Sequence, residues 1–182
     1  PPQSLWDSSL KKQTSERHST TWDWSDLVGL NDDFNRVVAL FHEGRLPQTL
    51  LFTGREGLGK TQFLSKLAAA FLCQEGQACG VCSSCQDVAH GRHDEVLFLE
   101  TQKHYKVEHA ASIHEHLSIQ AASQMVAGKL RVLPRIVLMP NLDRLNTQGA
   151  NRLLKVLEEP PGNCMILFST SRPKQLLETL LS

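Results

Sequence analysis

The 182-residue sequence has no net charge, few aromatic residues and no long apolar run. Its 19 Lys and Arg residues equal its 19 Asp and Glu residues, so no general basic surface argues for direct binding of nucleic acid, although a local basic patch is compatible with this total. No apolar stretch approaches the roughly 20 residues that a membrane-spanning helix needs. The N-terminus lacks the apolar core of a signal peptide, so we expect a cytoplasmic protein with no membrane contact.

With 41% hydrophobic residues, the chain is long enough for one well-buried domain. Residues 1–20 are rich in Ser, Lys and Gln, and we interpret them as a flexible N-terminal arm that precedes a domain over residues 21–182. Short apolar runs predict buried strands at 50–53, 96–99, 135–139 and 165–168.

Helical spacing of apolar residues predicts helices between these strands. One begins with Asn31 as its cap, one ends at about Cys73, and one runs from Thr147 to the Pro160-Pro161 pair. The region 106–127 is helical by composition. Strands that alternate with helices predict an α/β fold of three layers with a mainly parallel sheet.

The stretch from Gly54 to Thr61 fits the phosphate-loop pattern G-x-x-x-x-G-K-[ST] and lies between a predicted strand and a predicted helix. Glycines at 54, 57 and 59 let successive backbone N–H groups turn toward a phosphate. The N-terminus of the helix adds the positive end of its dipole. Lys60 is placed to contact the β- and γ-phosphates, and the Thr61 hydroxyl is placed to bind Mg²⁺.

Four of the five cysteines, at 73, 79, 82 and 85, lie within thirteen residues in the pattern C-x5-C-x2-C-x2-C. This spacing suits four thiolates around one tetrahedral ion, and Zn²⁺ is the natural candidate. Four protein ligands leave no open position for water, so the site would be structural. An iron–sulfur cluster and simple buried thiols are the alternatives. Cys164 is interpreted as a core residue.

Taken together, these motifs resemble the AAA+ ATPase module of bacterial clamp loaders, the delta prime and gamma/tau subunits of DNA polymerase III. The resemblance covers residues 24–182. It rests on Leu27-Val28-Gly29, the phosphate loop, the four-cysteine insertion at about 73–93, and the sequence NRLLKVLEEPP at 151–161. The stretch from Phe168 to Pro173 resembles the sensor 1 strand.

The resemblance implies a site for ATP or ADP with Mg²⁺, a structural Zn²⁺ ion, and a place in a hetero-oligomer with gamma/tau and delta subunits. The sliding clamp and primer–template DNA would be contacted through that complex. It places Gly54, Gly57, Leu58, Gly59, Lys60 and Thr61 on the phosphates, Val28 and Gly29 near the adenine, and Thr170 at the sensor 1 position. The family's lid and collar domains, and the arginine of its Ser-Arg-Cys motif, would follow Ser182.

One departure from the family pattern concerns catalysis. Active members have Asp-Glu at the end of the third strand, where the Asp helps to bind Mg²⁺ and the Glu polarises water; here Pro140-Asn141 occupy those positions. Proline offers no ligand, and an amide cannot act as a general base. Asp143 lies nearby, and we expect it to face solvent or a partner.

This departure favours a delta prime-like subunit that binds nucleotide without hydrolysing it. An active gamma/tau-like ATPase is the first alternative and would need another carboxylate at the Mg²⁺ site. A scaffold subunit that binds no nucleotide is the second, and a small-molecule kinase, for which we find no acceptor site, is the third.

Overall fold

Four parallel strands form the central sheet of the computed structural model, which describes residues 24, 27, 29–99, 105, 107–145, 147–158, 160 and 162–176. The strands are β1 (Thr49–Thr53), β2 (Val96–Phe98), β5 (Arg135–Met139) and β6 (Cys164–Thr170). Their order across the sheet is β1-β6-β5-β2, and every neighbouring pair is parallel. The predicted α/β class with a mainly parallel sheet is therefore confirmed. The N-terminal arm at 1–20 lies outside the described residues.

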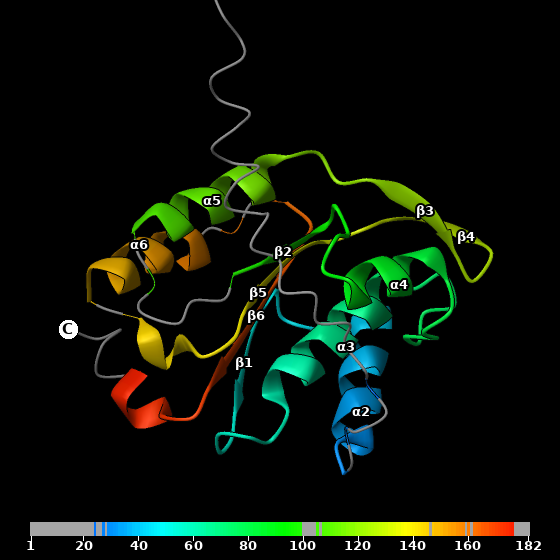
Figure 1. Ribbon diagram of the computed structural model, residues 1–182. Coiled ribbons are helices and arrows are strands. Elements are labelled where there is room, and N and C mark those ends of the chain that lie inside the picture. The colour runs from blue at the N-terminus through cyan, green and yellow to red at the C-terminus, as the bar shows by residue number, and fades with distance from the viewer. Residues whose placement is uncertain are drawn as a thin grey trace, which may run out of the picture.

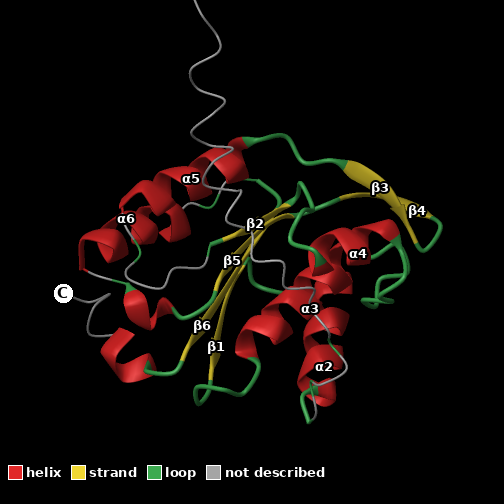
Figure 2. Cartoon of the chain, viewed as in Figure 1, coloured by secondary structure: helices red, strands yellow, loops and turns green. Residues whose placement is uncertain are grey.

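Helices cover both faces of this sheet, which gives three layers (Figures 1 and 2). One face carries α2 (Asn31–His42), α3 (Lys60–Leu72) and α4 (Ser83–Ala89). The other face carries α5 (Val107–Ser118), α6 (Thr147–Glu158) and the short helix η1 (Leu142–Arg144). Among the described residues, no helix is both long enough and apolar enough to cross a membrane.

Strand β5 shows why the strands are continuously apolar. Every residue of β5 is buried, and its side chains alternate between the two faces of the sheet. Ile136 and Leu138 pack into the core beneath α2 and α3, whereas Val137 and Met139 pack into the core beneath α5 and α6. A strand covered on both faces has no solvent side, so it needs apolar residues at consecutive positions.

The prediction of helix throughout 106–127 is wrong beyond Ser118. Helix α5 ends there, and β3 (Ser123–Val126) and β4 (Lys129–Val132) follow as an antiparallel hairpin. Ala127 and Gly128 form its two-residue turn with φ angles of 47° and 76°. Two consecutive positive φ angles characterise a type I′ turn, whose twist matches that of the flanking strands.

Two local details of the helices also differ from expectation. Asn31 is the first helical residue of α2, not its cap; Leu30 holds the cap position, and its carbonyl accepts a hydrogen bond from the Phe34 N–H at 2.9 Å. Helix α4, within the cysteine segment, was not predicted. It spans only seven residues and carries no extended apolar stripe.

Candidate functional site

The phosphate-loop motif forms the connection between β1 and α3, at the carboxyl end of the parallel sheet. Gly57 and Gly59 have φ angles of 83° and 70°, a region that residues with a side chain rarely adopt. A Cβ atom on Gly59 would also lie 3.1 Å from Leu27 Cδ2 and 3.2 Å from Gln62 Oε1. The backbone conformation therefore favours glycine at position 59, and a side chain there would also have to displace the ends of the Leu27 and Gln62 side chains slightly.

Lys60 is the first residue of α3, and its side chain folds back over the loop. Its Nζ donates hydrogen bonds to the carbonyl oxygens of Gly54 at 2.8 Å and Arg55 at 2.7 Å. The structure thus brings the Lys60 ammonium group, the N-terminus of α3 and Thr61 to one place. Positive charge and backbone N–H groups at a helix N-terminus are the ordinary elements of a phosphate site.

The structure supports the other predicted nucleotide contacts only in part. Leu58 is 57% exposed at the outer side of the loop, so its contribution to a phosphate site would come from its backbone. Gly29 is exposed and has a φ angle of 81°, and Val28 lies outside the described residues. The adenine contact of Val28 and Gly29 stays a prediction.

Strand β5 ends at Met139, and Pro140 and Asn141 follow at the same sheet edge as the phosphate loop. Asn141 has a left-handed backbone with φ of 58°, and its N–H donates to Ser169 Oγ at 3.3 Å. The hydroxyl of Tyr105 lies within hydrogen-bond distance of the Pro140 and Leu99 carbonyls, at 2.5 and 2.9 Å, and its one hydrogen is shared between them. These contacts fix the backbone after β5, but neither Pro140 nor Asn141 supplies a carboxylate there.

Asp143, in η1, accepts hydrogen bonds from three consecutive residues at the end of β6. Its Oδ1 accepts from Thr170 Oγ1 at 2.5 Å and from the Arg172 N–H at 2.9 Å. Its Oδ2 accepts from the N–H and the hydroxyl of Ser171, each at 3.0 Å. The expectation that Asp143 faces solvent or a partner missed these contacts: Asp143 is partly exposed, but its carboxylate binds the end of the neighbouring strand.

The charge of Asp143 is stabilised by these contacts. Partial burial acts to raise the pKa of Asp143, but the hydrogen bonds from Thr170, Ser171 and Arg172 together outweigh burial and lower it below its ordinary value. The carboxylate is therefore ionised at neutral pH and only accepts hydrogen bonds. Sequence reasoning missed this cluster because Asp143 and Thr170 are 27 positions apart.

The four predicted metal ligands come together, with their sulfur atoms within 4.8 Å of one another. The Sγ atoms of Cys79 and Cys85 are 4.0 Å apart, and those of Cys73 and Cys82 are 3.9 Å apart. Four sulfurs at the usual zinc–sulfur bond length of about 2.3 Å lie about 3.8 Å from each other in a tetrahedron. The donor set and its spacing therefore fit one tetrahedral ion.

Backbone N–H groups surround these sulfur atoms. Cys73 Sγ accepts from the N–H groups of Glu75 and Cys79 at 3.3 and 3.5 Å. Cys82 Sγ accepts from the Cys85 N–H at the start of α4. Burial acts to raise the pKa of Cys73, but the backbone hydrogen bonds outweigh it and lower this pKa to about 6. These contacts stabilise the thiolate of Cys73, the form that binds metal, whereas burial raises the pKa of Cys85, so Cys85 would become a thiolate only with the ion bound.

Cys164, the fifth cysteine, lies in β6 and is buried in the other core, as predicted for a core residue.

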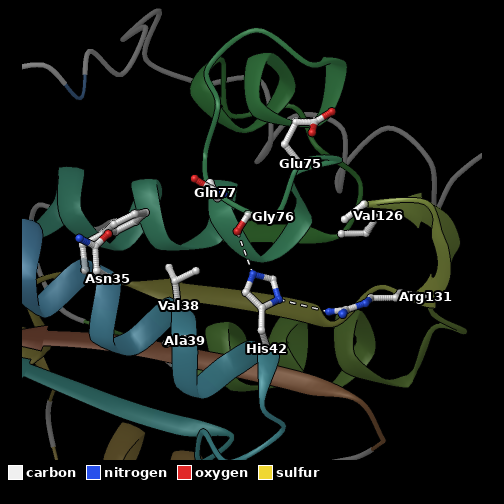
Figure 3. Close-up of a pocket in the computed structure, with 11 residues that line it drawn as sticks. Asn35, Val38, Ala39, His42, Glu75, Gly76, Gln77, Val126 and Arg131 are labelled. Atoms are coloured by element: carbon white, nitrogen blue, oxygen red, sulfur yellow. Dashed lines mark hydrogen bonds between the residues drawn. The ribbon is translucent and has the colours of Figure 1, made fainter.

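A cavity of about 420 Å³ lies between α2, the cysteine segment and the hairpin (Figure 3). At its centre His42 Nε2 lies 2.8 Å from the Gly76 carbonyl, and Arg131 lies 3.2 Å from His42 Nδ1. If Arg131 donates to Nδ1, the neutral ring donates from Nε2 to Gly76. The histidine therefore links three elements, and its role here is structural.

Three comparisons relate the chain to known proteins. Residues 30–182 match the family described as DNA polymerase III, delta subunit. The chain is 30% identical over 156 residues to subunit delta′ of Escherichia coli DNA polymerase III, covering 84% of this chain and 45% of that protein. It is 29% identical over 162 residues to subunit tau of the same organism, covering 87% of this chain and 24% of that protein.

A solved structure supports the fold. The chain resembles a gamma subunit-related protein from Thermotoga maritima with a TM-score of 0.50 and 18% identity, covering 85% of this chain and 42% of that one. At this identity the likeness concerns the fold alone. The chain spans less than half the length of each of these relatives.

Proposed function

The chain belongs to the DNA polymerase III delta subunit family, and we propose that it acts as a delta prime-like subunit of the clamp loader, helping to place the sliding clamp on primed DNA. Similarity to delta′ and tau proteins supports this role. In the proposal, the chain works within a hetero-oligomer of gamma/tau and delta subunits in the cytoplasm. The clamp and the primer–template DNA are contacted through that assembly.

Within this role, the chain binds ATP or ADP with Mg²⁺ through Gly54, Gly57, Leu58, Gly59, Lys60 and Thr61. The conformations of Gly57 and Gly59, and the position of Lys60 at the start of α3, support such a site. Bound Mg²⁺ would neutralise phosphate charge, and the Thr61 hydroxyl would be its ligand from the loop. The α3 N-terminus and Lys60 orient the phosphates.

The proposal that the chain does not hydrolyse the nucleotide rests on one observation, the arrangement of side chains after β5. The backbone there carries Pro140 and Asn141, and the nearby carboxylate of Asp143 is held by Thr170, Ser171 and Arg172. Asn141 can orient a water molecule but cannot remove its proton. Asp143 could take over that task only by giving up the hydrogen bonds that keep it ionised.

The cysteine segment binds a structural Zn²⁺ through Cys73, Cys79, Cys82 and Cys85. The sulfur separations near 4 Å and the N–H groups directed at the sulfurs support this assignment. Zinc would hold the loop that precedes α4. The loop in turn contacts the hairpin, since the Ala127 N–H donates to the Gln74 carbonyl at 2.8 Å.

In terms of domains, we assign residues 21–182 to an AAA+ domain with the zinc module inserted at about 73–93. The order of the strands across the sheet and the position of the phosphate loop after β1 support this assignment.

Reconstituted clamp loading tests the proposal. The full-length protein is combined with the other loader subunits, sliding clamp, ATP and primed DNA, and loaded clamp is counted with and without the chain. Omission should abolish loading, and adding the protein back should restore it. Unchanged loading in its absence would contradict a clamp-loader role.

A further inference from the structure

The hairpin of β3 and β4 packs against the segment that carries the four cysteines (Figure 1). In its turn, the Ala127 N–H donates to the Gln74 carbonyl at 2.8 Å. Side chains alternate along a strand, so Gln124 and Val126 share one face of β3 and Met125 lies on the other. Val126 is buried in the core beneath α2 and α3, whereas Met125 is 56% exposed. Gln124 therefore lies on the inner face of the hairpin.

The side-chain amide of Gln124 joins the two helices on either side of the cysteine loop. Its Nε2 donates at 2.5 Å to the carbonyl of Leu72, the last residue of α3. Its Oε1 accepts at 3.2 Å from the hydroxyl of Ser84, in α4. A carbonyl oxygen only accepts hydrogen bonds, so the Leu72 contact requires the NH₂ group of the amide on that side. One side chain thus connects the end of α3 to the start of α4.

Both contacts of the amide fall next to a predicted metal ligand. Leu72 directly precedes Cys73, and Ser84 directly precedes Cys85. These two cysteines are fully buried, whereas the other two of the set lie on the loop and are partly exposed. Gln124 therefore links the backbone next to the two buried ligands, which the sequence separates by twelve positions.

We propose that Gln124 is a positioning residue for the four-cysteine site, one that holds Cys73 and Cys85 at their binding separation before the ion enters. This inference rests on the proposed metal site. Gln124 is not a ligand; it acts on the peptide segments that carry two of the ligands. Ligands that are already in place lose less conformational entropy when the ion binds, so the metal binds more tightly. By linkage, metal binding also stabilises the docked hairpin.

Metal titration of the purified full-length protein tests this assignment. Dissociation constants for Zn²⁺ are measured by competition with a chromophoric chelator for wild type, Gln124→Met and the control Met125→Gln. Methionine has a similar length to glutamine but no amide to donate or accept. The control changes the adjacent residue, on the outer face of the same strand. A loss of stability that is equal in the metal-free and metal-bound protein leaves the dissociation constant unchanged.

Gln124→Met should bind Zn²⁺ about tenfold more weakly than wild type, the effect of losing one to two net hydrogen bonds. Met125→Gln should stay within about twofold of wild type. Ser84→Ala removes only the hydroxyl and should weaken binding by about threefold, so it provides the test should Gln124→Met fail to fold. Added to Gln124→Met, Ser84→Ala should cause no further loss, because its partner is already absent.

Hydrogen exchange gives a second readout of the same coupling. Removal of the metal from wild type with a chelator should speed the exchange of backbone amides at 123–132, since the metal and the docked hairpin stabilise each other. The metal should protect these amides less in Gln124→Met than in wild type. Met125→Gln should respond to the metal as wild type does.

Other outcomes separate the positioning role from the metal site. An unchanged Zn²⁺ constant in folded Gln124→Met, or an equal loss in Met125→Gln, would overturn the role of Gln124 and leave the metal site intact. If Gln124→Met does not fold, an unchanged constant in Ser84→Ala would have the same meaning. Exchange at 123–132 that does not respond to the metal would also overturn the coupling. No Zn²⁺ binding by wild type would overturn the four-cysteine site itself, and this inference with it.

Discussion

Replacing Arg135 by Met should destabilise the domain strongly, because Arg135 forms a buried ion pair with Glu95. Its Nε lies 3.0 Å from Glu95 Oε2, and the two side chains are only 9% and 5% exposed. The Nε–H is not aimed at that oxygen, so the contact is an electrostatic attraction without a well-formed hydrogen bond. The other guanidinium nitrogens donate to the carbonyls of Asp94 and Gln120, each at 2.9 Å.

The size of the effect follows from what Arg135→Met leaves behind. Glu95 would keep the Ala122 N–H at 3.1 Å as its side-chain contact but would lose its counter-charge inside the protein. Breaking a buried pair by removing one partner costs about 3–5 kcal/mol. For a domain of this size, 1 kcal/mol corresponds to about 2–4 °C, so the midpoint should fall by about 6–20 °C.

Urea unfolding followed by circular dichroism measures this loss, with Arg45→Met as the matched control. Arg45 pairs with Glu43 at the same distance of 3.0 Å, but the two side chains are 73% and 52% exposed. Its removal should cost less than about 1 kcal/mol. The reasoning would be refuted if Arg135→Met cost no more than this control. A double variant with Glu95→Leu should recover part of the loss, since apolar residues can replace a buried pair.

Three further changes test other parts of the structure. Lys60→Ala should weaken ATP binding by about a hundredfold. It should change the free energy of unfolding by less than about 1 kcal/mol, since the contacts of Lys60 to the loop are exposed or half-buried. Equal thermal stabilisation of variant and wild type by ATP would contradict this expectation. Cys82→Ser should lose zinc by elemental analysis whereas Cys164→Ala should retain it, and full zinc content in Cys82→Ser would rule out the four-cysteine site. Burial, with a smaller contribution from the Arg135 charge, lowers the pKa of His116 in the folded state. The unfolded state therefore binds this proton more readily as the pH falls below about 6.5, and stability is lost. His116→Gln should therefore lose less free energy of unfolding between pH 7.5 and pH 5.5 than wild type, and equal losses would show that His116 does not contribute.

The strands were predictable because burial on both faces leaves a signal in consecutive residues. The run Arg135–Met139 needs apolar residues at every interior position, and the sequence supplies them. The hairpin left no such signal. The outer face of β3 and β4 carries exposed Met125, Leu130 and Val132, and the turn is Ala127-Gly128 in place of the more usual Asn-Gly.

The candidate sites also differ in whether they could be predicted from the sequence. The phosphate loop and the cysteines are local patterns, so their spacing alone was enough to group them. The contact between Asp143 and Thr170 depends on β5 and β6 lying side by side in parallel, with their carboxyl ends at one edge. The predicted order of strands in the chain does not fix which strands are neighbours, and for this reason Asp143 was assigned to solvent or a partner.

A single-turnover experiment tests the central claim most directly, namely that this subunit binds nucleotide without hydrolysing it. The purified full-length protein, in excess over labelled ATP with Mg²⁺, is followed for bound ATP and for product ADP over time. Bound ATP should accumulate with no ADP above the level given by Lys60→Ala. Rapid formation of ADP that Lys60→Ala abolishes would contradict the account, because it would show that a catalytic group acts despite Pro140 and Asn141.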